Sequence, residues 1–515
     1  MIAVQDFVEP SMDLGAIVPI IAVLGAAVIG VLVDAFAPAG RRAPTNLTIS
    51  VVALVVALGW TIGQIGGSPV VTFNGAVVVD GPALLAQGAI ALFTLLSILL
   101  YTERRLDPTG DPFTPSGAVT PGSEMERVLT LQKVQQTEVF PLTLFAAGGM
   151  MIFVASNDLL TMFVALEVLS LPLYLLSSLS RRKRLLSQEA GLKYFLLGAF
   201  ASGFFLYGAA LVYGAAGSLN LAEIDAGVSA RVGVDSLLLV GMGMLAVGLL
   251  FKISAVPFQF WTPDVYQGAP TPVTGFMAAA TKTAAVVALM RLFYVGLGGL
   301  VEDWTILLWV IAAVTMLVGS VLALTQTDVK RMLAYSSIAH AGFLLVGIVA
   351  ADEAGIAAVL FYLLAYGIAT IGAFAVVTLV RDAGGEATHL AQWAGLGRRS
   401  PLLAGVFALF LLSFAGIPLT SGFIGKLTVF SAAFDAGQGA LVIVGLVSSA
   451  IAAFFYVRVI VLMFFSDPVE GGAAVGVPGS GTTAVITATA LLTVLLGVVP
   501  GPVLQLAQTA AEFVR

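Results

Sequence analysis

Apolar stretches about as long as a membrane helix alternate with short polar connections along nearly the whole chain. A helix that crosses a bilayer needs about 20 mostly apolar residues. On this basis the pattern predicts fourteen crossings, of which the twelfth is interrupted and counted as one broken helix. They are residues 14–36, 46–66, 82–101, 138–156, 158–179, 189–214, 235–256, 272–296, 304–325, 329–350, 354–380, 401–434, 441–465 and 484–506. We therefore predict an all-α polytopic membrane protein, with a polar solvent loop at 102–137.

The stretch FKISAVPFQFWTPDVYQGAPTPVTGFMAAATKTAA, which begins at Phe251, interrupts this pattern after the seventh crossing. Lys252 precedes the interruption and Lys282 stands within the next apolar run, with four prolines between them: Pro257, Pro263, Pro270 and Pro272. A membrane helix that loses backbone hydrogen bonds at proline must recover them from neighbouring protein or water. Ionisable residues at such interruptions are typical of the ion sites of transporters.

A second interruption of this kind occurs in LLSFAGIPLTSGFIGKLTVF, residues 411–430, within the twelfth crossing. Both runs break at a Val-Pro or Ile-Pro step, and the two breaks lie five crossings apart. Because five is odd, the second broken helix is predicted to run opposite to the first, as inverted-topology repeats require. The lysines differ in position, since Lys252 precedes Pro257 whereas Lys426 follows Pro418.

The composition supports the membrane assignment and limits the chemistry. Hydrophobic residues make up 59% of the 515 residues and charged residues 10%, against about 25% charged in water-soluble domains. The absence of cysteine excludes disulfides, thiolate-bound metals and iron–sulfur ligation, and two histidines are too few for a membrane haem cluster. No phosphate-loop or dinucleotide motif stands in a strand–turn–helix context. We expect no cofactor-binding site, no metal site and no redox chemistry within this chain.

The distribution of charge between alternate connections predicts the orientation, because cytoplasmic loops are enriched in lysine and arginine. One set of connections is basic and is therefore predicted to be cytoplasmic: Arg41, Arg42, Arg104, Arg105, Arg127, Lys133, Arg181, Arg182, Lys183, Arg184, Lys330, Arg331, Arg381, Arg398 and Arg399. The other set holds only two cations but gathers acids: Arg231 and Arg515, with Glu223, Asp225, Glu302, Asp303, Asp352 and Glu353. Both chain termini are then expected on the extracytoplasmic side.

Several charged residues fall inside the predicted crossings, where each costs about 2.5–3.5 kcal/mol even on permissive insertion scales. Glu167 is near the centre of the fifth crossing and is expected either to carry a proton or to hold helices together, with Lys252 as its partner in both cases. Lys252 and Lys282 lie in a dry region, where the charged form of a lysine is disfavoured. Snorkelling to the interface is the alternative for both, and it is difficult for Lys282, ten residues into its helix.

The remaining candidates for a relay role also fit structural roles. Lys426 follows Thr420 and Ser421, which suit a hydrated cavity. Lys193 is close to the cytoplasmic end of the sixth crossing and could snorkel. His340, midway along the tenth crossing, fits either a packing role or a relay role. Two arginines near crossing ends, Arg291 and Arg458, are expected to be anchors, and Asp328, Lys330 and Arg331 to lie at the interface.

At these residues the chain resembles the antiporter-like membrane subunits of NADH–quinone oxidoreductase, respiratory complex I. The similarity is carried by the stretch from Phe251 and by ALEVLSLPLYLL, QTDVKRMLAYSSIAHAGFLLVG and LSFAGIPLTSGFIGKLTVF. It covers roughly residues 140–465. Within the family, the DVYQGAPTPVT version and a lysine at 426 are similar to the subunit N branch, whereas subunit M usually has glutamate at that place.

The resemblance implies fourteen helices in two inverted five-helix repeats, with discontinuous helices seven and twelve. The expected divisions are 1–137 for three helices and a cytoplasmic loop, 138–296 and 304–465 for the repeats, and 466–515 for a loop and the last helix. It also implies a proton relay of buried residues. In that relay Glu167 is the helix-five carboxylate, and the further members are Lys252, Lys282, Lys426, Lys193 and His340.

The resemblance further implies a division of labour in a bacterial inner membrane. NADH, FMN, iron–sulfur clusters and quinone belong to partner subunits, and this chain neighbours another antiporter-like subunit and small membrane subunits. Separation of Glu167 from Lys252 would ease proton release from the lysine towards Lys282 and Lys426. Three alternatives stay open: a subunit of a multi-subunit cation/proton antiporter, a hydrogenase-linked membrane subunit, or a scaffold without a proton path.

Overall fold

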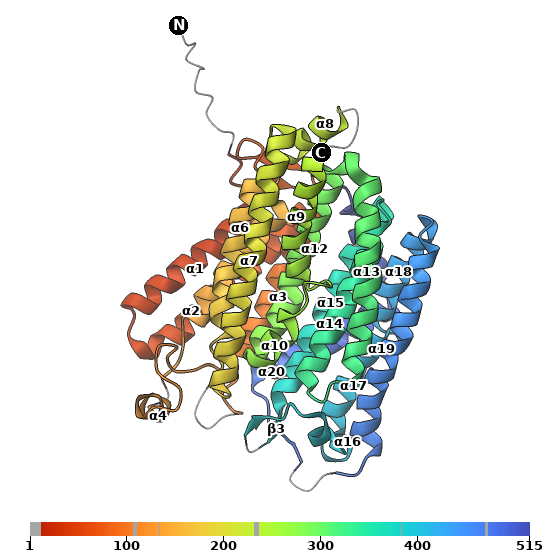
Figure 1. Cartoon of the computed structure of the whole chain (residues 1–515). Coiled ribbons are helices and arrows are strands. Elements are labelled where there is room, and N and C mark those ends of the chain that lie inside the picture. The colour runs from red at the N-terminus through yellow and green to blue at the C-terminus, as the bar shows by residue number, and fades with distance from the viewer. Residues whose placement is uncertain are drawn as a thin grey trace.

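The computed structural model describes residues 12–106, 111–132, 134–230, 236–382, 384–468 and 472–514. Three cations used to predict the orientation, Lys133, Arg231 and Arg515, lie outside these ranges. Long helices run side by side in one bundle (Figure 1). The helices of the first half are α1 (Val18–Phe36), α2 (Ala39–Gln64), α3 (Gly81–Tyr101), α4 (Glu124–Leu131), α5 (Val139–Ala155), α6 (Leu159–Ser177), α7 (Arg184–Ala216), α8 (Leu221–Ser229), α9 (Ser236–Ile253) and α10 (Trp261–Gly268).

One continuous helical stretch then passes through α11 (Thr271–Phe276), the π-helical η1 (Met277–Thr281), α12 (Lys282–Arg291) and the π-helical η2 (Leu292–Gly296). The second half holds the 3₁₀ turns η3 (Gly298–Leu300) and η4 (Leu390–Trp393). Its α-helices are α13 (Val301–Leu324), α14 (Val329–Val349), α15 (Glu353–Leu379), α16 (Leu396–Arg399), α17 (Pro401–Ala415), α18 (Ser421–Asp435), α19 (Gly439–Phe465), α20 (Ser480–Val498) and α21 (Gly501–Thr509).

The described residues confirm an all-α membrane fold of the predicted size. Twelve helices are long and apolar enough to cross a membrane, and α5 is a shorter apolar helix between two of them. The pair α17 and α18 forms the twelfth crossing, broken as predicted, and brings the number of crossings in the described residues to fourteen. The last crossing ends at Val498 and α21 follows Pro500. The expectation of one helix over 484–506 is therefore wrong at its end, because proline cannot continue a helix whose preceding residue must be extended.

The seventh and twelfth crossings are discontinuous, and protein groups satisfy the backbone at both breaks. Between α9 and α10, the Val256 N–H donates to Thr315 Oγ1 at 3.0 Å and the Trp261 indole donates to the Phe251 carbonyl at 3.0 Å. Between α17 and α18, the Gly422 N–H donates to Ser413 Oγ at 3.1 Å. This is how non-helical backbone is tolerated at membrane depth.

Matching details at opposite ends of the bundle support the inverted repeat. Asp158 caps α6 and forms a β-bridge with Asn220, which lies just before α8. Asp328 caps α14 and forms a β-bridge with His389, which lies just before η4. Figure 1 shows α8 at one end of the bundle and α16, which follows η4, at the other. The two broken crossings also run in opposite directions, so these features favour repeats at 138–296 and 304–465, whose limits stay a prediction.

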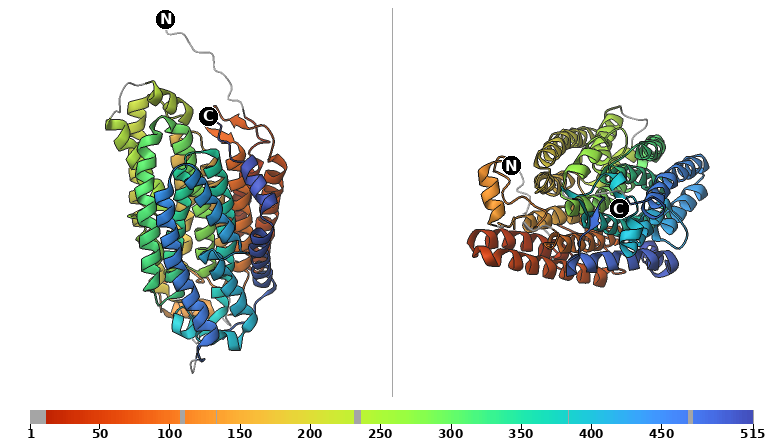
Figure 2. Two further views of the ribbon diagram at one scale, coloured as in Figure 1. Left: turned by 90° about the vertical axis from the view of Figure 1, so that its right-hand side faces the viewer. Right: turned by 90° about the horizontal axis from the view of Figure 1, so that it is seen from below.

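The helices differ in how far the protein itself covers them. The window of the crossing from Thr271 to Gly296 is 100% buried, and those of α14 and α15 are 94% buried, whereas that of α1 is 33% buried. Figure 2 shows α1, α2 and α20 along one side of the bundle. The eighth, tenth and eleventh crossings therefore form the interior, and apolar side chains of the outer helices face outwards, as a lipid environment requires.

Short strands that the hydropathy pattern did not predict close the ends of the bundle. β1 (Val70–Thr72) pairs with β2 (Val77–Val79), and β3 (Val380–Asp382) lies between β4 (Gly385–Glu386) and β5 (Ala474–Val475), all antiparallel. The predicted loop at 102–137 also contains the amphipathic helix α4. Runs of two or three residues carry too little period to be recognised in a sequence.

Candidate functional site

Lys252 lies in the last turn of α9, enclosed by aromatic rings. Its Nζ is 5.4 Å from the centroid of Tyr174 and 5.1 Å from that of Tyr194, and the residue is 3% exposed. Tyr194 stacks on Trp261 of α10 with centroids 4.5 Å apart. A cation over aromatic faces is attracted by the ring quadrupoles. Among the described residues, Lys252 Nζ has no hydrogen-bond partner.

Glu167 on α6, the expected partner of Lys252, does not form an ion pair with it among the described residues. Glu167 Oε1 is buried and accepts no hydrogen bond in this part of the chain. The carboxylate still acts on Lys252 and on Tyr174 by Coulomb interaction. The two groups are thus electrostatically coupled but not in contact, and the predicted role of Glu167 stays a prediction.

Lys282 begins α12, directly after the π-helical turn η1, at the centre of the most buried crossing. Its Nζ donates to the carbonyl oxygen of Ser337 and, at 2.6 Å, to the hydroxyl of the same residue on α14. The ring of Tyr366, on α15, lies 5.5 Å from Nζ. The residue is 2% exposed, so the snorkelling alternative fails for Lys282.

His340 stands on α14 between two tyrosine hydroxyls. Its Nδ1 is 2.6 Å from Tyr362 Oη and its Nε2 is 3.4 Å from Tyr456 Oη. Tyr456 is also hydrogen-bonded to Ser336. The imidazole ring lies 4.6 Å from the ring of Tyr366, which is the same ring that faces Lys282. Tyr366 therefore lies between the surroundings of Lys282 and those of His340.

Lys426, on α18, occupies the break of the twelfth crossing. Its Nζ donates to the carbonyls of Phe414 at 2.8 Å and Ala415 at 3.1 Å, and to Ser449 Oγ at 2.9 Å. These carbonyls end α17, where a helix dipole favours a cation. Phe414 also packs against His340, with centroids 5.6 Å apart. Lys282, His340 and Lys426 are therefore linked in one row through Tyr366 and Phe414.

Lys193 lies apart from this row, on the outward side of α7. Its side chain is 41% exposed, and Nζ is 2.6 Å from Glu189 Oε1 and 2.7 Å from Asp264 Oδ2. Asp264 also accepts from Arg331 Nη1 at 2.7 Å. The sequence analysis overlooked Asp264, because nothing in a linear pattern pairs residues 71 positions apart. Lys193 is thus partly exposed and ion-paired in this structure, and its predicted place in the relay stays a prediction.

The expectation that Arg291 anchors the chain at an interface is wrong. Its guanidinium is 0% exposed and forms two hydrogen bonds with Asp80, at 2.6 and 3.0 Å, while Nε donates to the Val154 carbonyl. The C-terminal segment covers the pair, since the Val514 N–H donates to Asp80 at 3.2 Å and the Phe513 ring lies 5.0 Å from the guanidinium. Arg458 is exposed, as an anchor would be, and donates to the Leu324 carbonyl.

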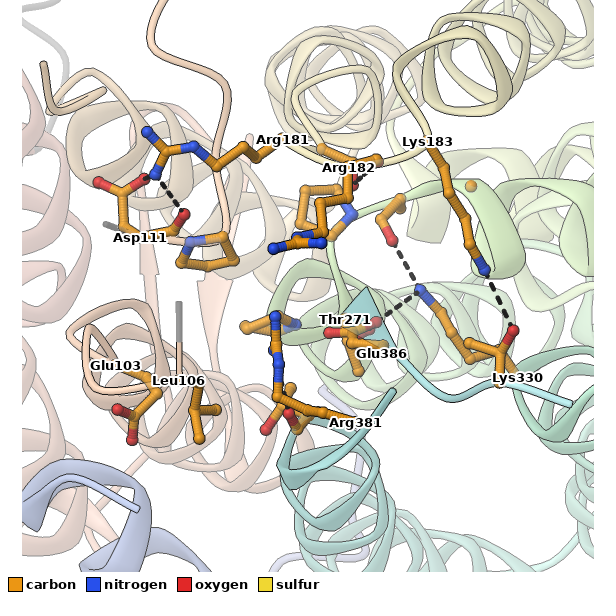
Figure 3. A pocket seen from close by; sticks show the side chains of 18 of the residues that line it. Glu103, Leu106, Asp111, Arg181, Arg182, Lys183, Thr271, Lys330, Arg381 and Glu386 are labelled. Carbon is orange, nitrogen blue, oxygen red and sulfur yellow. Dashed lines mark hydrogen bonds and ion pairs between the residues drawn. The ribbon is translucent and has the colours of Figure 1, made fainter. Parts of the chain in front are cut away.

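A pocket opens at the end of the bundle that carries the arginine run, between segments far apart in the sequence (Figure 3). Lys330 is buried there, against the interfacial expectation, and donates to the Ala269 carbonyl at 2.8 Å. Glu386 Oε2 lies 4.0 Å from Lys330 Nζ and accepts from Thr271 Oγ1 at 2.5 Å. Further charged residues that line the pocket are Glu103, Asp111, Arg181, Arg182, Lys183 and Arg381. It borders the start of α11, which leads to Lys282.

No group of three or more histidine, aspartate or glutamate side chains that could hold a metal ion occurs in the described ranges. The row of buried residues itself offers amines, an imidazole and hydroxyls. Such groups donate, accept and exchange protons.

Residues 156–452 match the family model described as NADH:quinone oxidoreductase/Mrp antiporter, TM. The NADH-quinone oxidoreductase subunit N of Rhodococcus opacus (strain B4) is 56% identical over 525 residues, which cover 98% of this chain and 97% of that protein. A chain of respiratory complex I from Thermus thermophilus with bound aureothin is 34% identical with a TM-score of 0.76, over 95% of this chain and 99% of that one.

A chain of the Mrp complex from Dietzia sp. DQ12-45-1b has a TM-score of 0.80, over 97% of both chains, at 23% identity. At this level of identity the similarity shows the fold alone.

Proposed function

The chain belongs to the subunit N family of NADH–quinone oxidoreductases, the antiporter-like membrane subunits of respiratory complex I, and on this premise we propose that it moves protons through a relay of its buried residues. It is a multi-pass membrane subunit of a proton-translocating oxidoreductase. In the relay, Lys252, Lys282 and Lys426 exchange protons, with Glu167 as the carboxylate that acts on Lys252 and His340 between the last two lysines.

The observation that carries the proposal is the burial of ionisable groups among neutral partners. Lys252, Lys282 and Lys426 are 3%, 2% and 5% exposed, and in the described part of the chain none forms an ion pair. Lys282 and Lys426 donate to hydroxyls and carbonyls, which accept a hydrogen bond from an ammonium group and from a neutral amine alike. Such sites suit a lysine that changes protonation. A scaffold would gain nothing from three charges, each costing about 2.5–3.5 kcal/mol.

The proposed stroke begins at Glu167 and Lys252. Because opposite charges favour each other's ionised forms, separating the carboxylate from the lysine eases release of the lysine's proton towards Lys282. The proton then passes along the row of Tyr366, His340 and Lys426 and leaves on the extracytoplasmic side. We assign proton uptake to the pocket of Figure 3, which holds Glu386 and Lys330 beside the start of α11. Lys193 acts on this relay through its ion pair with Asp264 of α10.

Redox chemistry and cofactors are assigned to partner subunits in this proposal. NADH, FMN, iron–sulfur clusters and quinone would be bound there, and a change of charge or conformation would pass between neighbouring membrane subunits to this chain. The neighbours are another antiporter-like subunit and small membrane subunits, in a bacterial inner membrane. The basic connections around Arg181 and Arg381 face the cytoplasm, and both termini lie outside.

The test is proton pumping by the purified complex in liposomes, measured per NADH oxidised. Lys282→Met and Lys426→Met remove the proton-carrying group but keep an apolar chain of similar length, so the complex should assemble while pumping falls. Arg458→Met is the control, because this arginine is exposed and outside the row. Unchanged pumping in both lysine variants would support the scaffold alternative instead.

The antiporter alternative is favoured by the Mrp-like fold but not by the sequence identities. Purification through a tag on this chain separates the two functions. Co-purification of NADH oxidation with flavin and iron–sulfur absorbance supports the respiratory complex. Small membrane partners without chromophores, together with sodium-dependent proton flux, would support an antiporter.

A further inference from the structure

Two adjacent residues of α7 connect the short helix α10 to the surroundings of Lys252. Lys193 is ion-paired with Asp264 of α10 at 2.7 Å, and Tyr194 stacks on Trp261 at the start of α10, at 4.5 Å between ring centroids. The same Tyr194 ring lies 5.1 Å from Lys252 Nζ. The position of α10 therefore decides where one aromatic wall of the Lys252 site stands.

The other side of α10 is attached to the second repeat through the same carboxylate. Asp264 Oδ1 accepts from Arg331 Nη1 at 2.7 Å, while Oδ2 accepts from Lys193. Arg331 lies in the first turn of α14, and its Nη1 also donates to Gln267 of α10 at 3.0 Å. Gln267 in turn donates to Asp328, the cap of α14, at 3.1 Å. Asp264 thus binds a cation from each repeat, and α10 is held between them.

The three side chains that attach α10 are partly covered by the protein. Side chains of Lys193, Asp264 and Arg331 are 41%, 32% and 28% exposed, so more than half of each is withdrawn from solvent. Removing the carboxylate would take the shared counter-charge from Lys193 and Arg331 and end the ionic connection between them, while Lys193 would keep its ion pair with Glu189. The helix would lose its ion pair with α7, leaving the Trp261–Tyr194 stack to hold it there alone, and one of its attachments to α14.

We propose that Asp264 is a positioning residue for Lys252: by fixing α10 between the two repeats it holds Trp261 against Tyr194, and thereby the aromatic wall of the lysine site. The inference rests on the proposed function, because it is the proposed relay that gives the position of Lys252 its meaning. It provides a physical connection from the start of α14, in the second repeat, to the relay lysine of the first. It also gives Lys193 a role outside the row of proton carriers.

Pumping by the intact complex in liposomes is the first readout. Asp264→Asn should lower protons pumped per NADH about tenfold, less than the roughly 100-fold that displacing a reacting group by about 1 Å can cost, because the aromatic wall and not the lysine itself is displaced. Asp264→Glu, which keeps both cations paired, should restore most of the loss. Glu189→Gln is the matched control, since Glu189 binds the same Lys193 Nζ at 2.6 Å but lies on α7 itself. Should the Asn variant not assemble, Arg331→Gln replaces it with the same expectation.

The second readout does not depend on pumping. The chain contains no cysteine, so Lys252→Cys places one thiol at the site, and its labelling by a small water-soluble thiol reagent is followed by the mass of this subunit. Adding Asp264→Asn should raise the labelling rate about tenfold, because the reagent reaches the thiol through local opening of the aromatic wall, whereas adding Glu189→Gln should not.

The outcomes separate the inference from the proposed function. Equal labelling and equal pumping in the Asp264→Asn and Glu189→Gln variants would overturn the positioning role. Normal pumping by Lys252→Met would overturn the proposed relay instead, and faster labelling with Asp264→Asn would then still support the structural connection.

Discussion

The ammonium group of Lys282 binds a single residue, Ser337, twice: through its carbonyl oxygen and, at 2.6 Å, through its hydroxyl. The lysine lies in the first predicted repeat and the serine in the second. Because the serine sits on α14, three residues before His340, it aims the amine at the helix that carries the next member of the row. In the proposed relay, this bond would position Lys282 for transfer across the predicted repeat boundary.

Replacing Ser337 by alanine should reduce proton pumping several-fold without loss of assembly. The carbonyl partner remains, but loss of a hydroxyl that bonds a charged group removes about 1.5–3 kcal/mol of local stabilisation. Ser320→Ala is the control, since Ser320 is buried on α13 and its hydroxyl has no hydrogen-bond partner among the described residues. If both variants pump alike, Ser337 does not position the lysine.

Removal of one partner from the Arg291–Asp80 pair should destabilise the protein strongly. A buried charge left without its partner costs about 3–5 kcal/mol, so Arg291→Met should lower the thermal stability of the subunit and its yield in the complex. The double variant Arg291→Met with Asp80→Asn removes both charges and should be more stable than the single one. Thermal unfolding of the purified complexes, followed through this subunit, measures the difference. A double variant less stable than Arg291→Met would contradict the account.

The two tyrosines that flank His340 should not contribute equally to pumping. Tyr362 Oη lies 2.6 Å from Nδ1, whereas Tyr456 Oη lies 3.4 Å from Nε2. Tyr362→Phe should therefore disturb the imidazole orientation more than Tyr456→Phe and lower pumping per NADH further. Because each change removes one hydroxyl from a buried ring, the two variants serve as controls for each other. Equal losses would argue for a packing role of the histidine.

The sequence predicted the crossings well because lipid imposes one requirement on every spanning residue: the backbone must be satisfied within its own helix and the side chains must be apolar. The breaks at Pro257 and Pro418 could be predicted from the same requirement, because proline has no backbone N–H to donate within a helix. The pairing of charges obeys no such local rule. Asp80 and Arg291 meet across 211 positions and Lys193 and Asp264 across 71, and only the packed helices bring them together.

A wrong inference about Arg291 illustrates the limit. Its place near the end of a crossing favoured an anchor, yet the chain folds its own C-terminal segment over that end and buries the guanidinium. Lys282 was easier to recognise as interior, because its place ten residues into its crossing leaves no route to the interface. Depth along a helix can be read from a sequence, whereas cover by another segment cannot.

The break of the twelfth crossing should tolerate no side chain at Gly422. A Cβ there would lie 1.9 Å from the Ser413 carbonyl oxygen, in the first turn of α18 where it packs against the last turn of α17. Gly422→Ala must push the half-helices apart, which costs about 1–3 kcal/mol or more for an overpacked site, and it moves the carbonyls of Phe414 and Ala415 that hold Lys426.

Gly405→Ala is the matched control, because a Cβ on that glycine of α17 meets no atom within 4 Å. Thermal unfolding and pumping per NADH should both fall for Gly422→Ala and stay unchanged for Gly405→Ala. Loss of stability with normal pumping would mean that the geometry of the break does not control Lys426, and that this lysine works through its charge alone.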